Sequence, residues 1–210
     1  MIHQLIAALY NPQMELPHNE QFYDEVLKEI NEYAVSSQLY FLMKQQGVLE
    51  ETPLFFQKRL KANYQTALYQ NIFIKKQMEQ LFSVLEEIGI DTIPLKGVYF
   101  AEAYFGHIGA RATTDIDLLI RKKDIQQAVQ AVKGLGFDLE EEPIPSHFHI
   151  SFSKRIPGSP FPLTVEIHWD ILKETTADLQ IEEFWNEARP LSPYERVKVL
   201  SDYHTLYLIC

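Results

Sequence analysis

Cysteine is almost absent from the sequence: there is one, Cys210, and it is the last residue. A single cysteine forms neither an intramolecular disulfide nor a cysteine-based zinc site, so the sequence favours a reducing, cytoplasmic location. Long apolar runs are absent too, since no uncharged apolar stretch approaches the 18 or so residues that cross a bilayer. The opening residues, MIHQLIAALYNP, lack the basic start and the small-residue cleavage site of a signal peptide. We therefore expect a protein without a membrane segment.

Positive charge is also scarce. Lys and Arg number 19 against 29 Asp and Glu, which gives a formal net charge of −10. A net-acidic chain without a basic block gains little from releasing the counterions of nucleic-acid phosphates, so unspecific nucleic-acid binding is disfavoured. The one local exception, Arg121-Lys122-Lys123, is more typical of a charged junction between a strand and a helix than of a phosphate contact.

The rest of the composition is that of an ordinary globular protein, with 46% hydrophobic and 23% charged residues. A length of 210 residues allows one domain with a substantial addition, or two small domains. We expect a helical region over 1–89, an α/β core over 90–190 and the start of a C-terminal helical region over 191–210. Because the final residues are apolar and lack a helix-ending signal, we expect the natural protein to continue beyond residue 210.

The first 90 residues have helical periodicity. Asn19 is a suitable N-cap for one helix, and a second helix, over 35–46, ends at Gly47. A long segment that opens near Thr52 has its apolar residues three and four positions apart, but their phase changes near Ile72. A single helix of this length would exceed the usual 8 to 20 residues, so we expect a bend or break near Ile72. The simplest interpretation of this region is a helical packing module without catalytic residues.

The second half alternates strand and helix patterns. We expect strands over 93–95, 116–120, 147–153 and 163–169. We expect helices over 98–105, over 123–135 and from about residue 201. This order predicts a small mixed sheet flanked by helices, and with the helical N-terminal region it makes the protein an α+β fold.

Two aspartates, Asp115 and Asp117, stand at the start of an apolar strand, although aspartate is depleted in strands. Alternation places both on one face, while Ile116 and Leu118 point to the other. Two carboxylates this close repel each other unless a cation neutralises them, and oxygen ligands of this kind suit Mg²⁺. Taken alone, the pair is more typical of a solvated strand end.

Three further features favour a functional site. Lys96-Gly97 closes a strand and opens a helix, where backbone N–H groups and a lysine can hold phosphate. Arg111 lies in a glycine-containing loop just before the acidic pair. Glu166 stands in the middle of an apolar strand, where an ionised side chain is costly without a partner.

These motifs, LKG at 95–97, GxRxxxDIDLLI at 109–120 and VEIHW at 165–169, resemble the uncharacterised nucleotidyltransferase family of the DNA polymerase β-like superfamily. The resemblance covers residues 85–170 well and the helical N-terminal region more loosely. It implies a mixed sheet with the acidic pair on one strand and a third carboxylate on an adjacent strand. Superfamily members usually have Gly-Ser at the phosphate-binding turn, whereas this chain has Lys96-Gly97.

The activity that the resemblance implies is nucleotidyl transfer: a nucleoside monophosphate passes from a nucleoside triphosphate to an acceptor hydroxyl, and pyrophosphate leaves. ATP is the favoured donor. Two divalent ions, Mg²⁺ or Mn²⁺, would lie about 4 Å apart and steady the attacking and leaving oxygens. The ligands implied for these ions, and the catalytic residues, are Asp115, Asp117 and Glu166. The phosphate contacts that we infer are Lys96, Gly97 and Arg111.

The acceptor is not identified by the sequence, but a small molecule or a protein hydroxyl is favoured over nucleic acid because the chain is acidic. One alternative is a catalytically degenerate nucleotidyltransferase fold that acts as a nucleotide-binding or protein-interaction module. Another is a helical interaction module that carries a small α/β domain, in which Asp115, Asp117 and Glu166 would lie apart.

Four histidines are further candidates. His107 lies in the loop near the proposed phosphates and is a possible substrate contact. His147 and His149 share a strand face, and with His168 they could form a transition-metal site, although ordinary hydrogen-bonded strand histidines are more typical.

Overall fold

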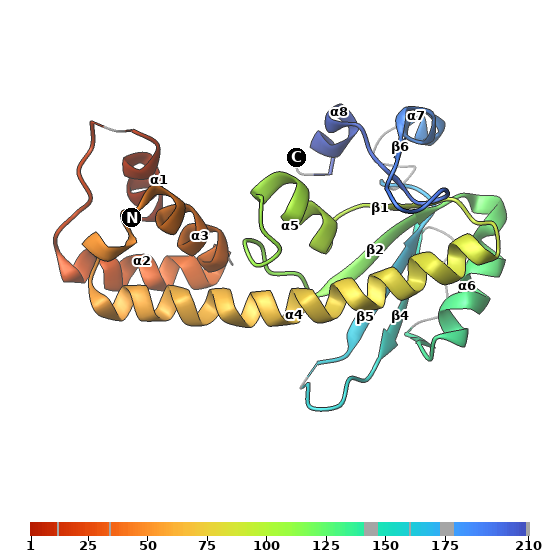
Figure 1. Ribbon diagram of the computed structural model, residues 1–210, viewed down its shortest axis with the longest axis horizontal. Helices are drawn as coiled ribbons and strands as arrows, with labels where there is room; N and C mark the ends of the chain where they lie inside the picture. Colours follow the sequence, from red (N-terminus) through yellow and green to blue (C-terminus); the bar gives the residue numbers. More distant parts are fainter. Residues whose placement is uncertain (12, 34, 141–146, 160, 173–178, 209–210) are drawn as a thin grey trace. The chain divides into compact units, whose positions relative to one another are not determined.

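The computed structural model describes the chain except for residues 12, 34, 141–146, 160, 173–178 and 209–210 (Figure 1). The described residues form two compact units. One contains Met1–Ile72 and Ala101–Thr113, and the other contains Phe73–Phe100 and Thr114–Cys210. The predicted α+β class is confirmed, because helices make up most of the first unit and a mixed five-stranded sheet lies in the second. The domain limits predicted at residues 89 and 190 stay predictions.

The first unit consists of helices and their connections. Its elements are α1 (Ile2–Tyr10), α2 (Glu20–Tyr33), α3 (Ser36–Gln46), a 3-10 turn (Leu49–Glu51) and the first half of α4 (Leu54–Glu87). The predicted cap of α2 is confirmed, since the side-chain oxygen of Asn19 accepts the Gln21 N–H at 2.9 Å. The predicted end of α3 is confirmed as well: Gly47 has a φ of 74°, which glycine adopts without a Cβ clash.

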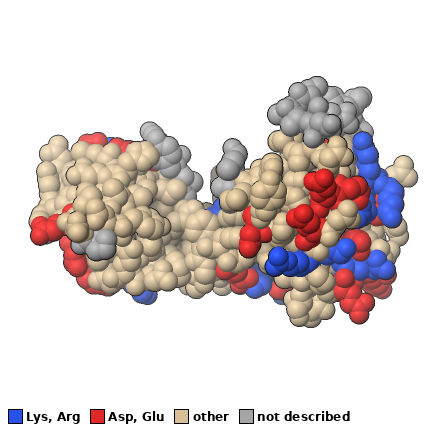
Figure 2. Space-filling model, turned by 90° about the horizontal axis from the view of Figure 1, so that it is seen from above, with Lys and Arg blue, Asp and Glu red and all other residues tan. Residues whose placement is uncertain are grey.

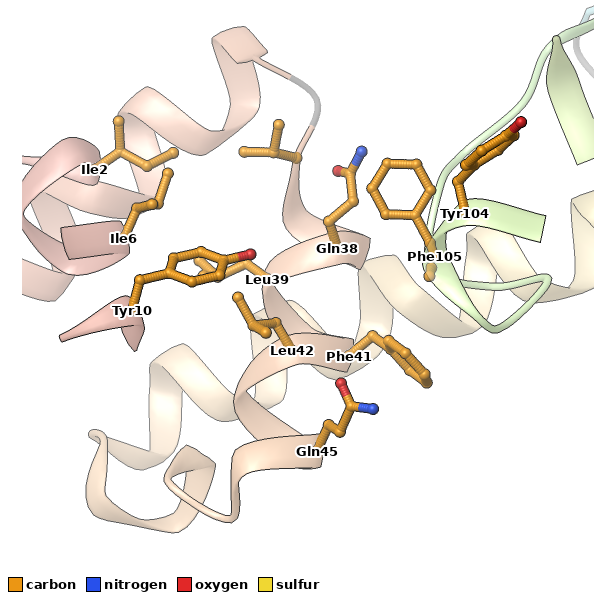
Figure 3. Close-up of a pocket in the computed structure, with 12 residues that line it drawn as sticks. Ile2, Ile6, Tyr10, Gln38, Leu39, Phe41, Leu42, Gln45, Tyr104 and Phe105 are labelled. Atoms are coloured by element: carbon orange, nitrogen blue, oxygen red, sulfur yellow. The ribbon is translucent and has the colours of Figure 1, made fainter. Parts of the chain in front are cut away.

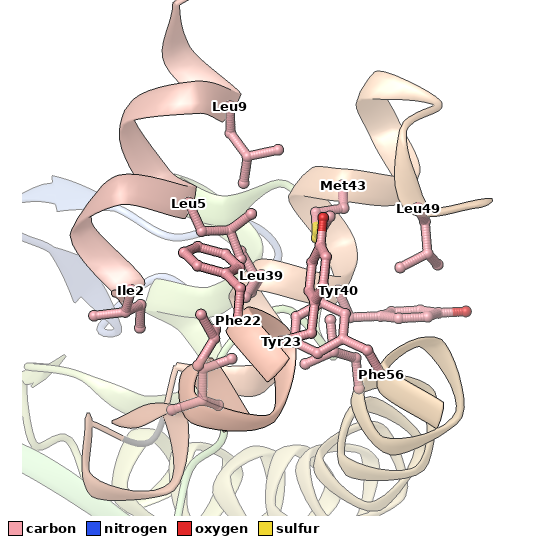
Figure 4. Close-up of a cluster of buried hydrophobic side chains, with 13 residues drawn as sticks. Ile2, Leu5, Leu9, Phe22, Tyr23, Leu39, Tyr40, Met43, Leu49 and Phe56 are labelled. Carbon is pink, nitrogen blue, oxygen red and sulfur yellow. The ribbon is translucent and has the colours of Figure 1, made fainter. Parts of the chain in front are cut away.

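An apolar cluster holds these helices together (Figure 4). Tyr23 of α2, Met43 of α3 and Phe56 of α4 are completely buried in it, and α1 contributes Leu5. The rings of Tyr23 and Phe56 lie 4.9 Å apart. Since each fully buried side chain of this size contributes about 1.5–3 kcal/mol of hydrophobic free energy, the cluster is the main source of stability for the first unit.

Of the bend or break predicted near Ile72, the break is wrong, because helix α4 passes through this position without interruption. The change of phase has a different cause, because the two halves of α4 bury their apolar residues in different cores. Phe56 and Leu60 belong to the cluster of the first unit, whereas Ile74 and Leu81 are buried in the second. Ile72, where the phase changes, is 52% exposed. Tertiary packing on both halves supports a helix longer than propensity alone would sustain.

The second unit contains a sheet with the strand order β1-β2-β5-β4-β3. The strands are β1 (Thr92–Pro94), β2 (Asp115–Ile120), β3 (Asp138–Leu139), β4 (His149–Lys154) and β5 (Leu163–His168). Strands β2 and β5 run parallel, and the other neighbouring pairs are antiparallel. Figure 1 shows β2, β5 and β4 side by side. The four predicted strands are confirmed, with ends shifted by one or two residues.

Helices and a second, small sheet accompany these strands. They are α5 (Gly97–Phe105), which begins in the second unit, α6 (Ile125–Gly134), α7 (Ile181–Glu187), β6 (Arg189–Pro190), β7 (Lys198–Val199) and α8 (Asp202–Leu206). Phe184 and Trp185 of α7, which the sequence pattern did not predict, pack in one cluster with Leu119 of β2. Arg121 pairs with Glu182 and lies 4.6 Å from the centre of the Trp185 ring. Arg121 therefore makes structural contacts, as expected of a charged junction between a strand and a helix. Among the helices described here, none is both long and apolar enough to cross a membrane.

The loop that precedes β2 is attached to α4 by one buried amide. The Nδ2 of Asn71, which has no exposed surface, donates to the carbonyls of Ile108 and Arg111 at 2.5 and 2.6 Å. Its Oδ1 accepts the Thr113 N–H at 3.1 Å. One side chain therefore satisfies three backbone groups of the loop, which otherwise has no regular secondary structure to pair them.

We predict that Asn71→Ala lowers the free energy of unfolding by about 3 kcal/mol or more, because it leaves these three backbone groups without their partner. Urea denaturation followed by circular dichroism measures the change. Asn63→Ala is the matched control: among the described residues, the Asn63 side chain makes one hydrogen bond, to the Ser36 hydroxyl at 3.0 Å, and its loss costs about 1 kcal/mol. Equal effects of the two substitutions would contradict the prediction.

Candidate functional site

The two aspartates occupy the start of β2, as expected. Ile116 and Leu118 are buried on the opposite face, which confirms the predicted alternation. The side chain of Asp117 is only 10% exposed. Because a carboxylate with so little access to water is costly to ionise alone, its immediate neighbours decide what this position can do.

Strand β5 places Glu166 next to Asp117. In the parallel pairing, Asp117 lies opposite Glu166 and Asp115 lies opposite Thr164. Residues that are paired across neighbouring strands point to the same face of a sheet, so Asp115, Asp117 and Glu166 share one face. The structure thus brings Glu166 beside the acidic pair, on an adjacent strand, and it does so through residues 49 positions apart in the chain.

An imidazole lies between the two carboxylates. The Nε2–H of His168 donates to Oε2 of Glu166 at 3.1 Å, and the same nitrogen is 3.6 Å from Oδ1 of Asp117. His168 is two residues beyond Glu166 on β5 and therefore points to the same face. It is 9% exposed. The sequence placed His168 on this face but did not predict that it contacts two of the three acids.

These contacts shift the pKa values of the group. Burial lowers the pKa of His168, but the neighbouring carboxylates of Asp117 and Glu166 outweigh burial and leave that pKa above its ordinary value. The hydrogen bond from His168 holds the pKa of Glu166 below its usual range, although burial opposes this. Both shifts favour a positively charged His168 beside an ionised Glu166, so a positive charge is stabilised at this position.

Strand β4 adds polar side chains to the same face. Ser151 lies opposite Glu166, and its hydroxyl is 3.5 Å from Oε1 of Glu166. His149 lies opposite His168, with the ring centres 5.1 Å apart. Burial lowers the pKa of His149. The sequence analysis did not predict that Ser151 belongs to this face. The signal for it was its position two residues after His149 on the same strand, which places both side chains on one face.

The proposed phosphate turn lies beside the acidic pair. The Leu95 N–H donates to the carbonyl of Asp117 at 3.0 Å, so β1 and β2 remain bonded up to this point. Lys96 follows with an exposed side chain. Gly97 begins α5 with a φ of 76°, which a residue with a Cβ rarely adopts. The turn therefore presents a lysine and a helix N-terminus next to β2, the arrangement that suits an anion.

Arg111 lies in the first unit, in the loop held by Asn71. The nearby Gly109 leaves little room for a side chain, since a Cβ at this position would lie 3.0 Å from the Tyr64 ring. His107 is engaged in the same loop: its Nδ1 accepts the Gly109 N–H at 3.0 Å, and the Tyr64 hydroxyl lies 2.9 Å from the same nitrogen. These bonds give His107 a structural role, and the phosphate contact of Arg111 stays a prediction.

The three acids carry donor atoms of the kind that a divalent cation takes, and their assignment as a ligand set stays a prediction. Among the described residues, the group whose ligand atoms lie close enough to hold an ion is His149, Glu166 and His168. Three carboxylates on one sheet face supply the oxygen ligands that Mg²⁺ and Mn²⁺ prefer. The contacts of His168 with Asp117 and Glu166 indicate that the position is already arranged for positive charge. Asp170, in contrast, lies beyond the end of β5, and its carboxylate accepts the Ile171 N–H at 2.7 Å.

The model of the uncharacterised nucleotidyltransferase family matches residues 19–210. The chain belongs to this family. The matched region contains each of the candidate residues that the sequence singled out, namely Lys96, Gly97, Arg111, Asp115, Asp117 and Glu166. Membership assigns the general kind of reaction, a transferase reaction of the nucleotidyl type. Neither the curated proteins nor the solved structures contain a match to the chain.

The first unit of this protein also contains a pocket, and its lining is mainly apolar (Figure 3). Its volume is about 420 Å³. The lining residues are Ile2, Ile6, Tyr10, Val35, Gln38, Leu39, Phe41, Leu42, Gln45, Tyr104, Phe105 and Ala110. Aromatic and aliphatic side chains with two amides make a lining that suits a small apolar molecule.

We predict that the imidazole of His168 titrates above its ordinary pKa of 6.5 in metal-free protein, because two carboxylates stabilise its charged form. A raised folded-state pKa means that the interaction stabilises the protein fully below about pH 6.5, and that this stabilisation is lost as the pH rises through the folded pKa. Two-dimensional NMR of the histidine ring nitrogens measures the titration.

Glu166→Gln removes one of the two carboxylates and lowers this pKa. Glu187→Gln is the control, since Glu187 lies 3.4 Å from His204 instead, and it leaves the titration of His168 unchanged. A wild-type pKa at or below the ordinary value would show that burial outweighs the carboxylates.

Proposed function

We propose that this protein transfers a nucleoside monophosphate from a nucleoside triphosphate to an acceptor hydroxyl. The acceptor hydroxyl loses its proton to water and its oxygen forms a bond to the α-phosphorus. The bond from the α-phosphorus to the bridging oxygen breaks, and pyrophosphate leaves. The observation that carries the proposal is the pairing of Asp117 with Glu166 on adjacent strands, next to the turn at Lys96. ATP is the favoured donor.

Asp115, Asp117 and Glu166 are the residues we assign to divalent cations, Mg²⁺ or Mn²⁺. When bound, such ions stabilise the negative charge that develops on the reacting phosphate oxygens. The lowered pKa of Glu166 keeps its carboxylate ionised, which supports a role as a metal ligand. The same lowered pKa makes this carboxylate a weak proton acceptor. We therefore assign Glu166 to the metal rather than to general-base catalysis.

Lys96 and the N-terminus of α5 are assigned to the phosphates of the donor. The lysine is exposed, follows directly on the residue bonded to Asp117, and carries the charge that a triphosphate requires. Gly97 lets the backbone turn into the helix at this point. Arg111, from the same family motif as the aspartates, would add a guanidinium fork suited to phosphate oxygens.

The acceptor that we propose is a small molecule or a protein hydroxyl. The net charge of −10 disfavours a polyanionic acceptor. On the face shown in Figure 2, the basic side chains of the described residues form small groups, several of them beside acidic ones. This distribution supports an acceptor other than nucleic acid, because nucleic-acid binding depends on many phosphate contacts.

We predict that Asp117→Asn weakens the Mg²⁺-dependent binding of ATP at least about tenfold, because it removes a charged ligand of the proposed metal site. Isothermal titration calorimetry with and without Mg²⁺ measures the effect. Asp138→Asn is the matched control, since it removes the same charge from an exposed position on β3, at the far edge of the same sheet. Equal Mg²⁺-dependent affinity in wild type and Asp117→Asn would remove the assignment.

Transfer itself requires a separate test. We expect the protein, incubated with Mg²⁺, cell extract and each α-³²P-labelled nucleoside triphosphate, to place label in an acceptor, and we expect EDTA to abolish the labelling. Asp117→Asn should reduce it by several orders of magnitude, since electrostatic stabilisation supplies most of the catalysis of phosphoryl-type transfer. Nucleotide binding without label in any acceptor would support the degenerate binding module instead, for which Lys96-Gly97 in place of Gly-Ser is the supporting feature.

A further inference from the structure

Two histidines beside Glu166 have no part in the proposed transfer. His149 and His168 lie directly opposite each other on β4 and β5. The backbone pattern brings their side chains close: the Trp169 N–H donates to the Phe148 carbonyl at 3.0 Å, so the next pair along, His149 with His168, is a pair without backbone hydrogen bonds. Side chains approach each other most closely at such pairs.

The three side chains converge. One potential ligand atom from each of His149, Glu166 and His168 lies within 4.8 Å of the other two. Two ligands about 2.1 Å from a tetrahedral metal ion are about 3.4 Å apart, so movements of about 1 Å bring these atoms to metal-binding distances. The three residues come from two paired strands, and such a scaffold holds ligands more rigidly than a loop does.

Both imidazoles have ring nitrogens that the protein does not satisfy. The Nδ1 atoms of His149 and His168 are buried and have no hydrogen-bond partner among the residues that the structure describes. Buried polar atoms without a partner are uncommon in folded proteins, and each one calls for an explanation such as an ion or a water molecule. Two such nitrogens in one facing pair indicate that these rings are arranged for more than packing.

The chemistry of the donors selects the ion. Mg²⁺ takes oxygen ligands and has little affinity for imidazole, whereas Zn²⁺ and other first-row transition metals prefer it. Two histidines and one glutamate, with a further position open to water or substrate, are a ligand set that Zn²⁺ adopts in proteins. The proposed Mg²⁺ site therefore does not account for the two histidines.

We propose that His149, Glu166 and His168 form a binding site for a divalent transition-metal ion, with Zn²⁺ as the best fit. The site depends on the histidines and stands whether or not the protein transfers nucleotides. Glu166 belongs both to this site and to the proposed catalytic carboxylates. An ion held by the histidines therefore lies next to the acidic pair.

Cobalt is the probe for this site, because Co²⁺ replaces Zn²⁺ and absorbs visible light when it is bound by nitrogen and oxygen ligands in a tetrahedral site. We expect one equivalent of Co²⁺ to give this absorption with the metal-free 210-residue protein without a histidine tag. One equivalent of Zn²⁺ should remove it, and a large excess of Mg²⁺ should not. Displacement by Mg²⁺ at comparable concentration would overturn the transition-metal assignment.

Substitutions locate the ion. His149→Gln should weaken Co²⁺ binding by more than the 10- to 100-fold that the loss of an outer-shell partner costs, and it should leave Mg²⁺-dependent ATP binding unchanged. His18→Gln is the matched control, because His18 is an exposed histidine of the first unit. His168→Gln should abolish the absorption, and circular dichroism checks that this variant folds. If it does not fold, His149→Gln, which alters a less buried ring, decides the matter.

The two proposals fail in distinguishable ways. Asp115→Asn should abolish Mg²⁺-dependent ATP binding and keep the Co²⁺ absorption, since Asp115 is not one of the three ligands. Absorption that is absent in wild type, or unchanged in His149→Gln, would refute the transition-metal site and leave the transferase proposal untouched. If every variant kept its Mg²⁺-dependent ATP binding, the transferase proposal would be refuted and the transition-metal site would stand.

Discussion

The parallel pairing of β2 with β5 is the constraint on which the acidic face depends. Within each strand, alternate residues are apolar and buried, among them Ile116, Leu118, Val165 and Ile167. A shift of the register by one residue would turn these side chains out of the core and move Glu166 to the wrong face. The hydrophobic free energy that fixes the register of the sheet therefore also fixes the position of Glu166 beside Asp117.

The carboxylates of Asp117 and Glu166 repel each other where they lie close together in a partly buried position. A neighbouring side chain reduces this repulsion. His168 contacts both carboxylates through one nitrogen and is stabilised in its charged form. The same electrostatic need for a cation underlies the proposed metal binding. The turn at Lys96 is bonded to Asp117 through the backbone of Leu95, so the lysine and the acids keep a fixed relation along the edge of the sheet.

Helix α4 illustrates how one element can serve two cores. Its periodicity shifts near Ile72, which the sequence alone favoured as a break, yet the helix is continuous. The shift marks the residue at which burial in the helical cluster gives way to burial in the second unit. Asn71, immediately before it, satisfies the loop that carries Arg111. The sequence contained no signal for this contact, because the burial of Asn71 is known only from the structure.

The sequence by itself determined four strands of the main sheet, several of the helices and the candidate acids. The strands, the caps at Asn19 and Gly47, and the shared face of Asp115 and Asp117 follow from local periodicity and residue conformations, which short segments carry on their own. Only the tertiary structure decided which strands are neighbours. It set His149 opposite His168, placed both next to Glu166, and gave α7 a position over Leu119. These contacts join residues far apart in the chain, and they arise from the packing of the whole sheet, which no local pattern specifies.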